Sequence, residues 1–435
     1  MNVEGSGMGE NPSIWKDQNF IKFFSANALS NLGNWFDFIA VLILFRYTWN
    51  ADPMLIAMIP VMYAIPSTLF GQLAGVFVDR KDKLRILIYS DWIRGCLTLL
   101  LVFVSSPMVA LFVLLLRNTV GVVGTPAQQG LVRNIVDEEN LMKAVTINGS
   151  LLQLVKVVGP LLGGSVSGVF SPDISIGINS VAFILSGIIL SRIALRNNEN
   201  NEGTTPDVHA HFFRSWKEGW EIVFKNRILL ASMLYGMVIT LTIQMIDAQL
   251  VTLFSEVFPN KTEMTGWTIS AIGGGSLLVI LVLTKLDTIK SYGWFFGTGS
   301  LLIGVMTGGL GFLDHQSTLI VAICFAFIGG IGTGITFTAV NYMIQKEPPT
   351  EAIGRVSGIV DSTLSILFIA GPLLGGVLIH HFGVLHVFRW IGVVLILIGT
   401  VGIIMRKVIW KKNVQEAGDV IAGVERRLRR ERDLG

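Results

Sequence analysis

Long apolar stretches, separated by short polar or charged segments, dominate the chain. Each is long enough to cross the hydrocarbon core of a bilayer as an α-helix, which takes about 20 residues. A helix suits that environment because it satisfies its own backbone hydrogen bonds. The twelve stretches span residues 20–47, 54–78, 86–106, 108–128, 143–170, 174–195, 228–254, 264–284, 291–312, 317–340, 354–380 and 385–406. The pattern predicts an all-α membrane protein with twelve transmembrane helices.

A polar stretch between the sixth and seventh apolar runs divides this pattern into two halves, each predicted to form a six-helix bundle. Aromatic residues recur at helical spacing over residues 212–225, opposite charged ones, which predicts an interfacial helix in the linker. The predicted parts are an N-terminal segment (1–19), a first bundle (20–195), a linker (196–227), a second bundle (228–406) and a basic tail (407–435).

A repeated hexapeptide supports the two-fold organisation. The sequence GPLLGG at residues 159–164 recurs unchanged at residues 371–376, and each copy lies in the fifth apolar run of its half. Proline removes a backbone hydrogen bond and bends a helix, while small residues let a neighbouring helix pack closely. We therefore expect helix kinks at Gly159, Pro160, Gly163, Gly164, Gly371, Pro372, Gly375 and Gly376.

Composition agrees with a membrane protein and excludes several other classes. Of the 435 residues, 51% are hydrophobic and 14% are charged, against about 25% charged in a soluble domain. The net charge of +3 is too small to indicate nucleic-acid binding. Two cysteines in different halves and six scattered histidines predict neither a disulfide framework nor a metal site. No phosphate-binding loop or nucleophile–base constellation stands out, so we expect no cofactor and no enzyme activity.

The distribution of basic residues predicts the orientation. Placing both termini in the cytoplasm leaves three of the 33 Lys and Arg residues (Arg46, Lys261 and Arg389) on the outer side, which is a strong positive-inside pattern. We expect a multi-pass protein of the bacterial inner membrane, without a signal peptide, whose basic tail is attracted to anionic lipid. No oligomerisation signal stands out, so a monomer is expected.

The first apolar run carries a polar face. Asn27, Ser30, Asn31, Asn34 and Asp37 fall within an arc of about 120° on a helix, which suits a wet cavity better than lipid. Asp37 lies roughly 25 Å into the run, at 1.5 Å per residue, and is a candidate for carrying a proton across the membrane. The alternative is an inert aspartate that is hydrogen-bonded near the outer mouth.

Two cations, Arg117 and Lys156, lie near the middle of their runs and need an anionic partner there. One hypothesis pairs Asp37 with either of them in one state and protonates it in the other; the alternative is a static pair that holds helices together. Gln244 and Asp247 in the seventh run are candidate counterparts of the first-run polar face, with a surface role as the alternative for Asp247.

Three segments resemble the major facilitator superfamily. The loop GVFVDRKDKLR at residues 75–85 is similar to the family's cytoplasmic loop, with Asp82 where a glycine is usual. Arg117 and Gly121 are similar to an element of exporters, with Val120 in place of glutamine, and GPLLGG is similar to an element associated with antiporters. NLGNWFDFIA in the first run and PAQQGLVRNIV at 126–136 resemble the enterobactin-exporter and macrolide-efflux branch of drug–proton antiporters.

The resemblance implies a secondary active transporter that works by alternating access. Its expected activity is proton-coupled export of a lipophilic or amphiphilic small molecule, such as a drug or a siderophore-like metabolite. An importer, a lipid transporter and a ligand sensor that transports nothing remain as alternatives. The resemblance also implies a cytoplasmic gate, in which Asp79 meets the start of the eleventh span and Arg80 meets Asp361. The gate residues are Gly75, Asp79, Arg80, Lys83, Arg85, Asp91, Arg94 and Asp361. Alternatively, the charged loop only orients the chain during insertion.

Overall fold

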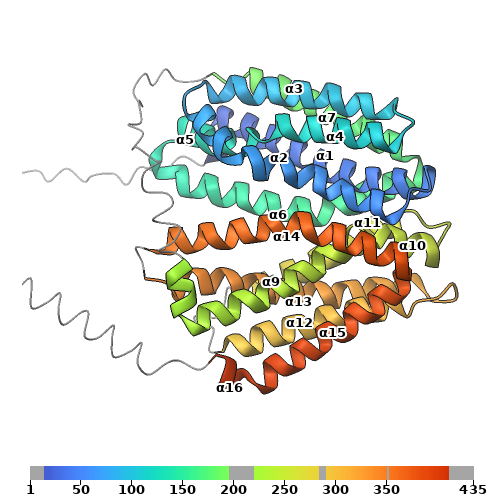
Figure 1. Ribbon diagram of the computed structural model, residues 1–435. Coiled ribbons are helices and arrows are strands. Elements are labelled where there is room, and N and C mark those ends of the chain that lie inside the picture. Colours follow the sequence, from blue (N-terminus) through green and yellow to red (C-terminus); the bar gives the residue numbers. More distant parts are fainter. Residues whose placement is uncertain (1–13, 195–219, 284–290, 350–351, 411–435) are drawn as a thin grey trace, which may run out of the picture. The chain divides into compact units, whose positions relative to one another are not determined.

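The computed structural model describes residues 14–194, 220–283, 291–349 and 352–410, and every regular element within these ranges is helical (Figure 1). The helices of the N-terminal part, which begin after a short 3₁₀ turn, are α1 (Gln18–Ile43), α2 (Pro53–Asp79), α3 (Lys83–Val102), α4 (Pro107–Gly121), α5 (Gly124–Ile135), α6 (Glu138–Val169) and α7 (Pro172–Ser191). A π-helical turn, Leu44–Thr48, extends α1.

The C-terminal part is built in the same way. Its helices are α9 (Arg227–Asp247), α10 (Leu250–Val257), α11 (Met264–Leu283), α12 (Tyr292–Gly311), α13 (Leu319–Lys346), α14 (Ile353–Phe382), α15 (Val384–Ile404) and α16 (Arg406–Ile409). Residues 220–225 are also helical, whereas the rest of the predicted interfacial helix, most of the linker and most of the tail lie outside the described residues.

Within the described residues, eleven segments are long and apolar enough to span a membrane. The helix α3 is the twelfth candidate of suitable length, and Lys83, Arg85, Asp91 and Arg94 make it too charged to meet the same criterion. Two of these charges, Asp91 and Arg94, are largely buried inside the protein, so α3 does not place them in contact with lipid, where a charge is costly. The predicted twelve-helix, all-α membrane fold is thus confirmed.

Short polar residues begin several helices where the apolar runs begin. The side chains of Asp17, Asp52 and Asp82 accept hydrogen bonds from backbone N–H groups in the first turns of α1, α2 and α3. Such N-caps satisfy donors that have no partner within the helix. Asp82, which departs from the family's usual glycine, therefore has a local structural role as the cap of α3.

Two predicted spans are interrupted. The run predicted over 108–128 breaks after Gly121 and continues as α5 to Ile135, and the run predicted over 228–254 breaks after Asp247 and continues as α10. The first break coincides with glycines and β-branched valines at residues 120–124, which have low helix propensity. Apolar content does not reveal the second break, because α9 and α10 are similarly hydrophobic.

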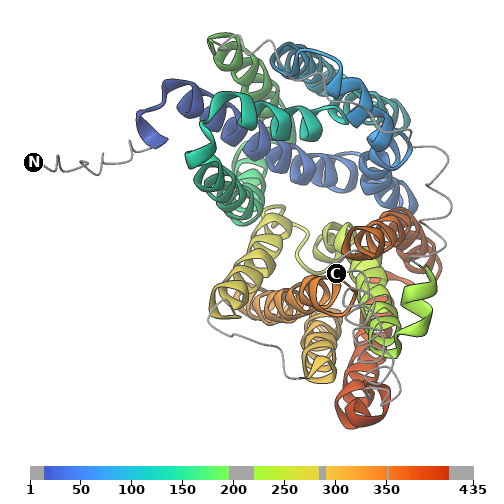
Figure 2. The ribbon, with the colours of Figure 1, turned by 90° about the vertical axis from the view of Figure 1, so that its left-hand side faces the viewer.

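The chain forms two compact units, bounded as Met1–Gly203 with Phe254–Ser270, and Thr204–Leu253 with Ala271–Gly435. In the first unit α1 packs against α6 and α7, and α3 packs against α7 and α4. In the second unit α12 packs against α13 and α15, and α9 packs against α14. Figure 2 shows these helices from their ends. Residues 254–270 belong to the first unit although they follow the linker in the sequence. The domain boundaries predicted from the sequence remain predictions.

Candidate functional site

The polar face of α1 turns into the first unit. Asn27, Ser30 and Asp37 are buried, while Asn31 and Asn34 are partly exposed. Because α6 and α7 flank α1, and residues of α2, α3 and α4 reach it with their side chains, its polar groups meet partners from several helices.

A buried ion pair forms the centre of this site. Arg117 Nη1 on α4 lies 2.6 Å from Asp37 Oδ2 on α1, and neither side chain has any exposed surface. Tyr63 on α2 completes the pair, since its hydroxyl donates to Asp37 Oδ2 (2.9 Å) and accepts from Arg117 Nη2 (2.6 Å). Thr98 on α3 accepts a longer hydrogen bond from Arg117 Nη1 (3.4 Å). Four helices thus contribute one residue each.

The pairing explains how these charges can be buried. Desolvating a lone carboxylate or guanidinium costs several kcal/mol, and an opposite charge at hydrogen-bond distance offsets that cost. The pair is not fully satisfied, because Asp37 Oδ1 and Arg117 Nε have no hydrogen-bond partner among the described residues.

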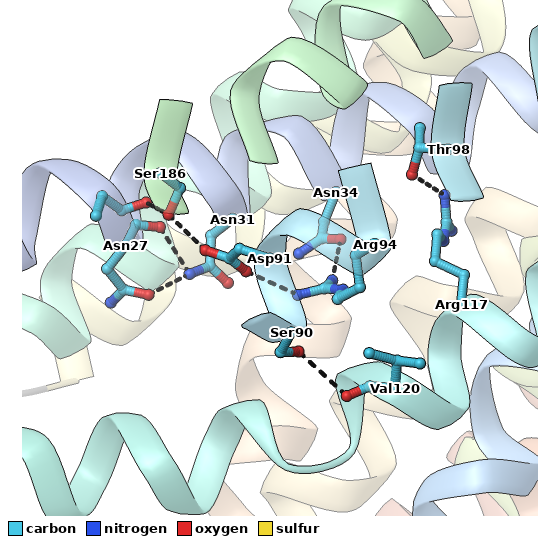
Figure 3. Close-up of polar contacts among 11 residues, drawn as sticks. Asn27, Asn31, Asn34, Ser90, Asp91, Arg94, Thr98, Arg117, Val120 and Ser186 are labelled. Carbon is cyan, nitrogen blue, oxygen red and sulfur yellow. Dashed lines mark hydrogen bonds and ion pairs between the residues drawn. The ribbon is translucent and has the colours of Figure 1, made fainter. Parts of the chain in front are cut away.

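A second polar cluster lies next along α1 and α3 (Figure 3). Arg94 donates through Nη2 to Asn34 Oδ1 (2.8 Å), and its Nη1 lies 3.6 Å from Asp91 Oδ1. Ser186 on α7 donates to Asp91 Oδ2 (2.6 Å). The Arg94 guanidinium also stacks 4.1 Å from the ring centroid of Phe183.

Asparagines extend the polar track towards the start of α1. Asn31 donates to Asn27 Oδ1 (2.6 Å), and Asn27 donates to Asn148 Oδ1 on α6 (2.5 Å). Asn27, Asn34 and Asp37 therefore share one face of α1 and bond to side chains of α6, α3, and α2 with α4, respectively.

Several partners in this site were not predicted from the sequence: Tyr63, Thr98, Asn148 and Ser186. They are neutral and occur singly in apolar runs, so no charge marks them. Two sequence features could have indicated some of these partners: a tyrosine in the middle of α2, and small polar residues at helical spacing on α7.

The other predicted cavity residues lie apart from this cluster. The Lys156 side chain is exposed and has no hydrogen-bond or ion-pair partner among the described residues. In the second unit, the Gln244 side chain packs against Gly371, and Asp247 forms no hydrogen bond or ion pair within the described ranges.

Most predicted gate residues are exposed. Asp79, Arg80 and Asp361 are exposed, and a Cβ at Gly75 would meet nothing within 4 Å. Arg85 pairs with the cap Asp82 at 3.3 Å, whereas the aliphatic part of Lys83 packs against Gly130.

Asp91 and Arg94 differ from the rest of the predicted gate. They lie in the interior of the first unit, where their partners are Asn34 and Ser186 instead of the charged loop. The reason is their position, since Asp91 lies eight residues into α3, or about 12 Å along it. The gate itself remains a prediction.

The two hexapeptides make equivalent contacts. A Cβ at Gly163 would lie 2.8 Å from the Cα of Phe36 on α1, and one at Gly375 would lie 2.8 Å from the Cα of Met245 on α9. Gly159 and Gly371 likewise face Trp35 and Gln244. In each unit the fifth long helix therefore packs closely on the first, and both α6 and α14 run through their prolines, Pro160 and Pro372. Gly164 instead meets Gly266 at the start of α11.

Comparison with known proteins agrees with this architecture. The sequence profile of the Major Facilitator Superfamily matches residues 23–372. The MFS-type transporter YfiS of Bacillus subtilis (strain 168) is 28% identical over 92% of this chain and 96% of its own length. Macrolide efflux protein A of Streptococcus pyogenes is 22% identical over 81% of this chain and 87% of its own length.

A solved structure shows the same fold. It is a bacterial homologue of the human lysosomal transporter Spinster, crystallised inward-facing and unoccupied, and it matches with a TM-score of 0.67 at 13% identity over 92% of this chain and 97% of that one. The profile match, the twelve helices and the repeated glycine motif lead to one conclusion. The chain belongs to the Major Facilitator Superfamily.

Proposed function

We propose that this transporter is a proton-coupled exporter of lipophilic or amphiphilic small molecules. The observation that carries the proposal is the ion pair between Asp37 and Arg117, which is wholly buried in the first unit. Ionisable residues within membrane spans are costly to bury and commonly mark ion or proton pathways, which supports a functional role for this pair.

Protonation of Asp37 is the step that the geometry supports. A proton arriving on the carboxylate converts it to an acid and releases Arg117 from its charged partner. The Tyr63 hydroxyl bonds to both groups and can follow either protonation state, because a hydroxyl both donates and accepts. Coupling then follows, since the freed guanidinium must find a new anion or move its helix.

Export, and not import, is supported by similarity. Macrolide efflux protein A carries efflux in its name, and its match extends over most of both chains. Arg117, Gly121 and the hexapeptide at residues 159–164 also resemble elements of exporters and antiporters. The small-molecule class follows from the same relatives, with macrolides as the first compounds to try.

The test is accumulation of radiolabelled erythromycin and a panel of lipophilic dyes in bacterial cells that lack their own efflux pumps. One strain expresses this chain, one Asp37→Asn and one Asp173→Asn, a control that removes a partly exposed aspartate at the start of α7. Each strain is measured with and without a protonophore, at matched expression.

Proton-coupled export predicts that the wild type and Asp173→Asn lower accumulation, that the protonophore abolishes this effect, and that Asp37→Asn does not lower accumulation. Efflux by Asp37→Asn at the wild-type rate would contradict the role of Asp37. Uptake in place of efflux would indicate an importer, and no flux of any compound would favour a lipid transporter or a sensor.

A further inference from the structure

The cluster around Asp91 contains a second buried ion pair that the Asp37 mechanism leaves unexplained. The side chains of Arg94 and Asp91 are only 12% and 8% exposed. Building on the proposed function, we propose that Asp91 is a second proton-carrying carboxylate of the first unit, and that Arg94 links its protonation to that of Asp37.

The contact between Arg94 and Asp91 is loose. Their nearest atoms are 3.6 Å apart, whereas charged N–H···O bonds are usually about 2.7–2.9 Å long. Each group instead makes its short hydrogen bond to a neutral partner, Arg94 to Asn34 and Asp91 to Ser186. A proton on Asp91 therefore breaks no tight ion pair.

Ser186 can accommodate both protonation states of Asp91. Its hydroxyl lies 2.6 Å from Asp91 Oδ2 and 3.1 Å from the backbone carbonyl of Ala26, so one hydrogen has two possible acceptors. When Asp91 is ionised, the hydroxyl donates to the carboxylate. When Asp91 carries a proton, the acid donates to Ser186 Oγ, and Ser186 donates to Ala26. Neither state leaves a buried donor unpaired here.

Asp91 also borders a small polar cavity of about 10 Å³, which is close to the minimum needed for one water molecule. Its polar lining consists of Asn27, Ser30, Asp91, Gln128 and Ser186. A water there has enough polar partners to hydrogen-bond Asp91 and Asn27 together, which would support either protonation state of Asp91.

Arg94 connects this group to the central ion pair. It is within electrostatic range of Asp91, Asp37 and Arg117, and its Nε has no hydrogen-bond partner among the described residues. Asn34, which Arg94 contacts, precedes Asp37 by one helical turn. Gly121 makes room for this arrangement, since a Cβ there would lie 3.3 Å from Arg94 Nε.

The surroundings of Asp91 contain no competing titratable group within the described part of the chain. Arg94 is the charged residue that acts on it, and the groups that face it from α1, α5 and α7 are the neutral Asn27, Gln128 and Ser186. Arg94 thus couples two carboxylates: when Asp91 takes up a proton, Arg94 acts more strongly on Asp37 and favours loss of the Asp37 proton. In that exchange Asp91 becomes an acid, Asp37 becomes a carboxylate, and Arg94 stays charged throughout.

The experiment is a pH titration by infrared difference spectroscopy of the full chain in lipid, which needs no substrate. Carbon-13 labelling of the aspartate carboxyl groups identifies aspartic acid bands. The wild type is compared with Asp37→Asn, Asp91→Asn, Asp91→Glu and Asp173→Asn, after circular dichroism has confirmed that each is folded.

We expect two buried-acid bands that appear on acidification. Asp37→Asn removes one. Asp91→Asn removes the other and moves the midpoint of the remaining band to lower pH by about one unit, because Arg94, no longer paired with Asp91, then stabilises the Asp37 carboxylate more strongly. Asp91→Glu keeps a titrating acid at a shifted band position outside the aspartate label. Asp173→Asn leaves both buried midpoints unchanged.

The inference is overturned if Asp91→Asn retains both bands and the wild-type midpoint, or if Asp91→Glu retains both labelled bands. Should Asp91→Asn fail to fold, the Asp91→Glu spectrum decides alone. A spectrum of Asp37→Asn that keeps both bands would instead contradict the role of Asp37 in the proposed function. The two failures are therefore separable.

Discussion

At the scale of single residues, the first unit concentrates its buried charge on a few side chains that share hydrogen bonds. Asp37, Arg117 and Tyr63 form a closed triangle in which every pair is bonded. Ser90 shows a simpler use of a polar group, since its hydroxyl donates to the carbonyl of Val120, just before α4 ends. Carbonyls at a helix end lack an intrahelical partner, so this bond offsets the break.

The buried ion pair predicts a non-additive effect on stability. Asp37→Asn alone leaves the buried charge of Arg117 without its anion, and Arg117→Gln alone leaves that of Asp37 without its cation. Each should lower the free energy of unfolding by about 3–5 kcal/mol. The double variant should cost much less than the sum of the two, because no lone charge remains. Thermal unfolding in detergent, followed by tryptophan fluorescence, measures the three variants; additive losses would show that the two residues are not coupled.

The hydroxyl of Tyr63 predicts a smaller, specific loss. Tyr63→Phe keeps the ring but removes a donor to Asp37 and an acceptor for Arg117, which should lower the free energy of unfolding by about 1–3 kcal/mol. Tyr89→Phe is the matched control, since Tyr89 is 58% exposed. The same unfolding assay applies, and equal effects of the two substitutions would contradict a bridging role for Tyr63.

At the scale of helices, the repeated hexapeptide has a packing role that both halves share. Gly163 faces Phe36 and Gly375 faces Met245, so each fifth helix approaches its first helix at corresponding positions. The residue after Phe36 is Asp37, but the residue after Met245 is Ile246. The repeat therefore keeps the close helix contact in both halves, whereas the carboxylate of the second half, Asp247, lies one residue further along than Asp37 does in the first.

This close contact predicts a sharp difference between two glycines of α6. Gly163→Ala would place a methyl group 2.8 Å from the Cα of Phe36, and the resulting strain should cost about 1–3 kcal/mol. Gly149→Ala should be neutral or stabilising, because a Cβ there meets nothing within 4 Å and alanine favours the helix. Unfolding temperature and yield of folded protein report the difference, and similar values for both variants would argue against tight α1–α6 packing.

At the scale of the whole molecule, the two units differ in the buried charges that they contain. Both buried ion pairs found in the described residues, Asp37–Arg117 and Asp91–Arg94, belong to the first unit. In the second unit, glycines of α12 allow close approach to its neighbours; a Cβ at Gly304 would lie 2.8 Å from the backbone nitrogen of Ile396 on α15. Charge chemistry is thus concentrated in one unit.

The distribution of Lys and Arg predicts the orientation of the whole chain. In a background with Cys96→Ser and Cys324→Ser, a cysteine replacing Gln316 should react with a membrane-impermeant maleimide in intact cells. A cysteine replacing Lys81 should react only after the membrane is permeabilised, since its loop is predicted to be cytoplasmic. Both positions are exposed in the structure, so access alone cannot explain a difference. The opposite labelling pattern would invert the predicted topology.

The amino-acid pattern is enough to predict the number of long helices and the fold class, because hydropathy and length are local properties of each segment. It also marked Asp37 and Arg117, since ionisable residues in apolar runs are rare and conspicuous. It could not choose between Arg117 and Lys156 as the partner of Asp37, nor detect the break of the fourth span near Val122. Helix composition does not report which faces meet.

Those pairings became visible in the three-dimensional structure. It placed Asp91 and Arg94 of α3 in contact with Asn34 of α1 and Ser186 of α7. These residues are far apart in the sequence, and nothing in their spacing predicts that they meet. Tyr63 became part of the site for the same reason, because a neutral residue in an apolar run gains its role from the buried charges beside it. Side-chain partnership depends on how helices rotate and pack against each other, and that information is not present in any single segment.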